Sequence, residues 1–175
     1  MDRDKNFAEW STEEIVDEYA DMVYRLALTK AGNREDAQDI FQEVFLRLVK
    51  YRNRILSIEH LKAWLIRVTI NCARKHTGSL WKKRVQFFEE EDVHQLHDPY
   101  SKQEYERVEN HDSPMTKAVK QLAEIYRIVI YLFYYEDLSI EQISSILEEK
   151  ESTIKSRLHR ARELIKAKLK GGTDL

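Results

Sequence analysis

The side chains with the clearest chemical capability lie near the C-terminus, in residues 155–170. This stretch holds seven Lys or Arg residues and a single acid, Glu163. Clustered cations of this kind are the electrostatic footprint of a surface that binds phosphate. The chemistry that they predict is recognition of a nucleic acid. The alternative interpretation is the solvated face of an ordinary surface helix, which also carries Lys and Arg.

Two short helices are expected to position these cations. Ser139 caps the first helix, and Gln142 completes a capping box three residues later. After a polar break at residues 148–151, Ser152 or Thr153 opens the second helix. This order of elements indicates a helix-turn-helix, in which the second helix enters the major groove of DNA.

The second helix is amphipathic, with its apolar residues recurring at helical spacing. These residues are Ile154, Leu158, Ala161 and Ile165. Because successive side chains are rotated by about 100° along a helix, the cations and hydrogen-bond donors occupy the opposite face or its flanks. The residues predicted to contact DNA on this helix are Thr153, Lys155, Ser156, Arg157, His159 and Arg160.

A second basic segment occupies residues 62–84, with seven Lys or Arg residues and no acid. A helix predicted from about Ser57 to Gly78 carries its polar side chains on the surface, and an aromatic and basic piece, LWKKR, follows it. Interleaved aromatic and basic residues suit stacking on unpaired bases along a charged track. The side chains concerned are Arg67, Asn71, Arg74, Lys75, Trp81, Lys82, Lys83 and Arg84.

Composition indicates a folded, all-helical protein of 175 residues. With 42% apolar residues the chain is not disordered by composition, and it has no apolar run long enough to span a membrane. Gly and Pro are scarce and strand-like alternation is almost absent. The single cysteine, Cys72, cannot form an internal disulfide, and the polar N-terminus does not resemble a signal peptide. Both features favour a cytoplasmic protein.

The charge pattern divides the chain, although the net charge is only −2. Residues 89–112 contain nine acids against two bases, which separates the two basic segments. The predicted fold is all-α, with two small helical domains joined by an acidic linker. The expected boundaries are 1–87 for the first domain, 88–113 for the linker and 114–175 for the helix-turn-helix domain.

Other helices are predicted from caps and periodicity. Ser11 with Glu14 forms a capping box for a helix that stops at Gly32, and Asn33 caps the next helix. Residues 51–60 are expected to form a loop. An apolar stripe at helical spacing then runs from residue 118 through residue 132, with Ala118, Leu122, Ile125, Val129 and Leu132. The outward face of the helix after Asn33 is predicted to include Asp39, Gln42, Glu43 and Leu46. That face is either ordinary surface or a docking site for a partner helix.

No catalytic residue, cofactor or metal is predicted. The histidines show no HExxH-type spacing, and His94 with His97 lies in the expected linker without a nearby cysteine. An enzyme is therefore the least favoured class.

The chain resembles bacterial extracytoplasmic-function (ECF) sigma factors. The N-terminal signature comprises REDAQDIFQEVFLRLVKY, LKAWLIRVTINCARKH and LWKKR, and the C-terminal one is QLAEIYRIVIYLFYYEDLSIEQISSILEEKESTIKSRLHRAREL. Two such signatures in this order are far more specific than a helix-turn-helix alone. The resemblance covers about residues 17–168, apart from the linker.

The resemblance implies a two-domain specificity subunit that carries core RNA polymerase to promoters. The face with Asp39, Gln42, Glu43 and Leu46 would bind the polymerase, and the helix from Thr153 would read the minus-thirty-five element. The loop at 51–60, with Asn71, would receive a flipped base of the minus-ten element, and the basic residues that follow would guide the opened strand. The implied partners are core RNA polymerase, promoter DNA and a cognate anti-sigma factor, without membrane insertion.

Three positions depart from the family pattern. Glu148 and Glu149 stand where the turn usually has a glycine and an apolar residue, so position 148 is strained if it needs a positive φ. Lys75 replaces a frequent acid, and Ala123 replaces a common proline. The remaining alternative is a stand-alone helix-turn-helix transcription regulator, which would leave the basic segment at 62–84 without a purpose.

Overall fold

The computed structural model describes residues 10–76 and 113–171. Within these ranges every regular element is a helix, as the composition predicts. The chain divides into two compact units, residues 1–99 and residues 100–175. The expected linker, apart from Ser113, and the expected helix end at Gly78 lie outside the described residues.

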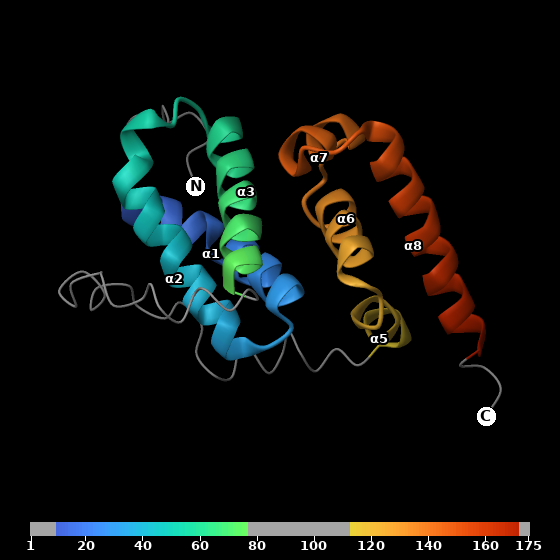
Figure 1. The fold of residues 1–175 in the computed structure, drawn as a ribbon. Coiled ribbons are helices and arrows are strands. Elements are labelled where there is room, and N and C mark those ends of the chain that lie inside the picture. The colour runs from blue at the N-terminus through green and yellow to red at the C-terminus, as the bar shows by residue number, and fades with distance from the viewer. Residues whose placement is uncertain (1–9, 77–112, 172–175) are drawn as a thin grey trace. The chain divides into compact units, whose positions relative to one another are not determined.

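The described part of the first unit, residues 10–76, contains three long helices. They are α1 (Thr12–Ala31), α2 (Arg34–Tyr51) and α3 (Ile58–His76), with the 3-10 turn η2 (Arg52–Arg54) between α2 and α3. Each helix packs against the other two, and α1 lies across α2 and α3 (Figure 1). The fully buried side chains of the core include Ile15, Leu26, Ile40, Phe45, Leu48, Leu61 and Leu65.

Local sequence signals set the ends of these helices as predicted. The Ser11 hydroxyl accepts from the Glu14 backbone N–H at 3.1 Å, and the Glu14 carboxylate accepts from the Ser11 N–H at 2.7 Å. Gly32 ends α1 with φ 78°, a left-handed conformation that glycine adopts without a steric penalty. Asn33 then caps α2. The predicted loop at 51–60 is shorter than expected, because α2 includes Tyr51 and η2 follows it directly.

Residues 113–171, the described part of the second unit, form four helices. They are α5 (Pro114–Lys120), α6 (Glu124–Tyr134), α7 (Ile140–Leu147) and α8 (Glu151–Gly171). All three shorter helices contact α8, which is the longest element of the unit (Figure 1). Its buried side chains, Ile154, Leu158, Ala161 and Ile165, are those that the periodicity predicts. They share a core whose other buried members include Val129, Leu132 and Ile143.

The helical period expected from residue 118 through residue 132 is interrupted. The helix α5 ends at Lys120, and Ala123 is extended (φ −60°, ψ 147°) just before α6 begins at Glu124. The Arg127 guanidinium donates to the carbonyl oxygens of Lys120 (3.1 Å) and Leu122 (2.9 Å), which satisfies acceptors that the interrupted helix leaves open. As a result Ile125, expected on the inward stripe, is 47% exposed.

Candidate nucleic-acid and polymerase interfaces

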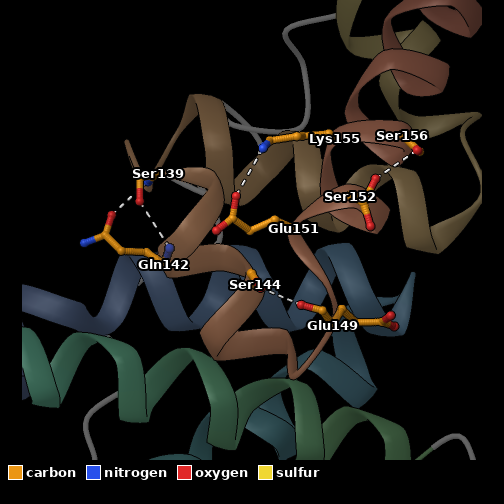
Figure 2. A network of polar contacts seen from close by, with 8 residues as sticks. All are labelled: Ser139, Gln142, Ser144, Glu149, Glu151, Ser152, Lys155 and Ser156. Carbon is orange, nitrogen blue, oxygen red and sulfur yellow. Dashed lines mark hydrogen bonds and ion pairs between the residues drawn. The ribbon is translucent and has the colours of Figure 1, made fainter.

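The helix-turn-helix begins at the predicted cap. The Ser139 hydroxyl accepts from the Gln142 N–H at 3.1 Å, and the Gln142 side chain accepts from the Ser139 N–H at 2.8 Å (Figure 2). This capping box starts α7 and satisfies two backbone donors that would otherwise lack partners. The apolar stripe of α7 then buries Ile143 and Ile146.

The turn between α7 and α8 uses a left-handed residue. Glu148 has φ 58° and ψ 38°, and its backbone N–H donates to the Ser144 carbonyl. Glutamate at such a position carries a steric cost that glycine avoids, so the strain expected from the sequence at residue 148 is present. Asp137, the other described non-glycine residue with a positive φ (52°), precedes α7.

The second helix begins one or two residues earlier than predicted. Because the Lys150 carbonyl accepts from the N–H groups of Thr153 and Ile154, α8 already includes Glu151. Ser152 therefore lies inside the first turn and does not cap it. Its carbonyl accepts from the Ser156 hydroxyl at 2.9 Å (Figure 2).

The outer face of α8 presents most of the predicted DNA-binding side chains to solvent. Lys155, Ser156, His159 and Arg160 are exposed, and Thr153 is half-buried. The Lys155 ammonium pairs with the Glu151 carboxylate at 3.1 Å, an exposed contact one helical turn apart that costs little to exchange for phosphate (Figure 2). Arg157 differs from these residues, because its side chain is only 23% exposed and is bonded to Glu149.

The C-terminal half of α3 carries a second group of predicted DNA-binding residues. Arg67, Asn71, Arg74 and Lys75 are all exposed. They share α3 with Leu61, Leu65 and Cys72, which are fully buried on its other side. The predicted contacts at Trp81, Lys82, Lys83 and Arg84 lie outside the described residues.

Leu56, in the short connection before α3, is an exposed apolar residue that the sequence pattern did not single out. It is 83% exposed, the highest fraction among the large hydrophobic side chains of the described residues. Its backbone N–H lies 3.4 Å from Nδ1 of His60, and the N–H of His60 donates to the Ser57 hydroxyl at 3.1 Å. An apolar residue inside a predicted loop was the available signal.

The predicted polymerase-binding face of α2 needs one correction. Asp39 and Gln42 are exposed and Leu46 is half-buried, but Glu43 is only 9% exposed. The Glu43 carboxylate binds the Arg47 guanidinium, with Oε1 and Nε 2.6 Å apart. The expectation that Glu43 faces outward was therefore wrong, because α2 packs against both α1 and α3 and buries a wider stripe than its apolar residues indicate.

Cys72 lies beside this ion pair. Burial raises the pKa of its thiol to about 11, and the nearby Arg47 cation opposes that shift. A neutral, buried thiol of this kind behaves as a small apolar side chain. Cys72 is therefore part of the apolar core of the first unit.

The described ranges form neither a metal site nor a helix that could span a membrane. Within residues 10–76 and 113–171, no group of three or more His, Cys, Asp or Glu side chains is arranged to hold a metal ion. His94 and His97 lie outside these ranges. No helix of the described residues is long and apolar enough to cross a membrane.

Comparison with known proteins places both units in one family. Residues 15–83 match the family model of sigma-70 region 2, and residues 114–165 match that of sigma-70 region 4. The chain is 30% identical to the RNA polymerase sigma factor SigV of Bacillus subtilis over 83% of each chain. It is 28% identical to the ECF RNA polymerase sigma factor SigW of the same species, over 90% of this chain and 88% of that one.

A solved structure has the same fold. It is the sigma factor RpoE of Bartonella quintana in complex with the anti-sigma factor NepR, with a TM-score of 0.64 and 20% sequence identity. The alignment covers 90% of this chain and 96% of that chain. The match to region 2 gives the first unit a role that a stand-alone helix-turn-helix regulator would lack, and the comparisons lend that alternative no support. The chain belongs to the ECF sigma factors, alternative sigma factors that direct promoter-specific transcription by RNA polymerase.

Proposed function

We propose that three surfaces of this sigma factor divide the work of transcription initiation. The outer face of α8 reads the minus-thirty-five element, the exposed polar face of α3 handles the minus-ten element, and the exposed part of α2 binds core RNA polymerase. The observation that carries the proposal is the division of α8 into two faces. Lys155, His159 and Arg160 are exposed, whereas Ile154, Leu158 and Ala161 opposite them are buried.

On α8, two side chains are proposed to have different tasks. Arg160 is the better candidate for a base contact, because a guanidinium can donate two parallel hydrogen bonds to guanine O6 and N7. Lys155 is proposed to bind phosphate, exchanging the Glu151 carboxylate for a DNA oxygen. Thr153, Ser156 and His159 complete this surface.

On α3, Asn71 is proposed to help hold a base flipped out of the non-template strand of the minus-ten element. Its exposure leaves the amide available to hydrogen-bond a base edge. Arg67, Arg74 and Lys75 are proposed to bind the backbone of the opened strand, continued by Trp81, Lys82, Lys83 and Arg84.

On α2, the proposed contact with polymerase consists of Asp39, Gln42 and Leu46. Two polar side chains beside one half-buried apolar residue suit a protein interface with a small apolar centre. Glu43 supports this surface from inside through its ion pair with Arg47.

The domain boundaries and the remaining partners are also proposals. We place the domains at 1–87 and 114–175, joined by 88–113, and the division between compact units at residues 99 and 100 falls within that connection. A cognate anti-sigma factor is proposed because the solved relative is bound to one. The chain is proposed to act in the cytoplasm, where core polymerase is present, and to supply specificity without catalysis of its own.

Reconstitution tests the proposal. The full chain is mixed with core RNA polymerase on a library of genomic fragments, and the 5′ ends of the transcripts are sequenced. We expect start sites that share two upstream motifs and that are absent with core polymerase alone. Start sites identical to those of core polymerase would refute the proposal, and specific footprints formed without polymerase would favour the stand-alone regulator.

A further inference from the structure

Arg157 is distinguished from the other cations of α8 by its burial and its partner. Its Nη2 donates to Oε1 of Glu149 at 2.9 Å, and its side chain is 23% exposed. By contrast, the side chain of Lys155 is 59% exposed. The ion pair occupies Nη2 of Arg157, and the low exposure of the side chain limits the approach of DNA to its remaining N–H donors.

Glu149 is also attached to the preceding helix. Its backbone N–H donates to the Ser144 carbonyl at 3.1 Å, and its carbonyl accepts from the Ser144 hydroxyl at 2.5 Å (Figure 2). The main chain of Glu149 is thus bonded to the last turn of α7, while its side chain is bonded to α8. A single residue therefore bridges the two helices of the motif.

The ion pair between Glu149 and Arg157 lies at the part of α8 that is proposed to contact DNA. Arg157 follows Lys155 and Ser156 and directly precedes Leu158, which is 2% exposed. Side chains that recognise a ligand must be held to within about 0.5 Å of their working geometry. A link between the turn and residue 157 restrains the first two turns of α8, where those side chains begin.

We infer that Glu149 and Arg157 are positioning residues for promoter recognition, and that Arg157 makes no base or phosphate contact of its own. The pair fixes α8 against α7, so that Lys155 and Arg160 reach the upstream element in the correct register. This inference rests on the proposed function of α8. Arg157, which the sequence placed on the DNA-binding surface, then supports that surface and does not itself contact DNA.

A charge exchange tests the inference in the complete holoenzyme. The measured quantity is the ratio of transcription from two promoters that differ only in an intact or a scrambled minus-thirty-five element. We expect Glu149→Arg and Arg157→Glu each to lower this ratio about three- to tenfold, a range typical of contacting residues. The double variant should recover at least half of the loss, because the ion pair re-forms with its charges exchanged.

Recovery distinguishes positioning from direct contact. If Arg157 contacted a base itself, a glutamate at residue 157 would lower the ratio whatever stood at residue 149. If Arg157 bound phosphate, Arg157→Glu would weaken both promoters about equally and would hardly change the ratio. If the ratio in the double variant stayed as low as in the single variants, with helicity retained in circular dichroism, the inference would be overturned.

If the charge-exchanged variants do not fold, the milder variant Glu149→Gln still tests the inference. Positioning predicts a lower ratio for Glu149→Gln, whereas direct contact predicts an equal or higher ratio, because Arg157 is released toward DNA. Glu163→Gln serves as the matched control, since it removes the same charge from an exposed position of α8 and should leave the ratio unchanged.

The promoter ratio measured for the wild-type holoenzyme tests the proposed function of α8 separately from the inference about Glu149 and Arg157. A wild-type ratio near one would reject α8 as the reader of the upstream element, and the inference would fall with it. A high wild-type ratio that falls in Arg160→Ala, with no effect of Glu149→Gln and no recovery in the double variant, would reject the inference alone.

Discussion

Glu43 and Arg47 form an ion pair within α2, and the Glu43 side chain is only 10% exposed although its charge suggested a surface position. Both groups lie close enough to Cys72 of α3 to affect the pKa of its thiol. The pair therefore belongs to the contact between α2 and α3. It leaves Asp39, Gln42 and Leu46 as the outward residues of the proposed docking face.

Removing the Glu43 carboxylate should destabilise the first unit. Glu43→Ala leaves Arg47 without its charged acceptor at a partly buried site, which we expect to cost about 1–3 kcal/mol. Urea unfolding followed by tryptophan fluorescence measures this, because Trp10, Trp64 and Trp81 all lie in the N-terminal half. The control Gln42→Ala, at an exposed neighbouring position, should change the free energy by less than about 0.5 kcal/mol. Equal effects of the two variants would show that the ion pair does not stabilise the fold.

Reversing the charge of Asp39 should weaken assembly with core polymerase. Asp39→Arg reverses the charge at residue 39 in the proposed interface. We expect the affinity for core polymerase to fall at least about tenfold. Helicity should not change, because Asp39 is exposed. Glu18→Arg makes the same charge change on the exposed surface of α1 and should leave assembly intact. Wild-type affinity for Asp39→Arg in a titration with labelled core enzyme would exclude this face.

Glycine at residue 148 should stabilise the helix-turn-helix. Glu148 has φ 58°, where a side chain costs about 1 kcal/mol or more, so Glu148→Gly should slow amide exchange in α7 and α8 about fivefold. Hydrogen exchange read by mass spectrometry measures this. Glu163→Gly, inside α8, should have the opposite effect, because glycine weakens a helix interior by about 1 kcal/mol. Faster exchange in Glu148→Gly would mean that the glutamate side chain stabilises the turn.

Features decided within a few residues could be predicted from the sequence. The caps at Ser11, Asn33 and Ser139 depend on a side chain and a backbone group three residues apart, and all three were predicted. The positive φ at Glu148 followed from the position of glycine in related turns.

Features that depend on tertiary contacts could not be predicted in this way. Glu43 is buried because two helices cover α2, and helical spacing alone does not give the width of that contact. Arg157 lies on the flank of α8, where its direction is decided by Glu149, eight residues earlier and across the turn. The break before Ile125 depends on Arg127 satisfying open carbonyls, which no periodicity reveals.

Asn71 should act in promoter opening and not in initial binding. Extracting a base from the stack costs a few kcal/mol, which a shaped pocket must offset, so Asn71→Ala should impair melting while sparing the closed complex. Permanganate reactivity of unpaired thymines on a duplex promoter should fall, and a pre-melted bubble should restore transcription. Glu18→Ala, at an exposed position of α1, provides a control that should leave permanganate reactivity unchanged. Failure of the bubble to restore transcription would assign Asn71 another role.

Transcription from promoter pairs that differ only in the minus-thirty-five element tests the central claim, that the outer face of α8 reads this element. Loss of a bidentate base contact is worth roughly 1–3 kcal/mol of discrimination, so Arg160→Ala should reduce transcription chiefly from the intact promoter. Lys155→Ala, which removes a phosphate contact, should weaken both promoters about equally and lower the salt slope by roughly one unit. Neither variant should alter assembly with core polymerase. Equal losses on intact and scrambled elements for both variants would contradict the account and leave α8 as a solvated basic helix.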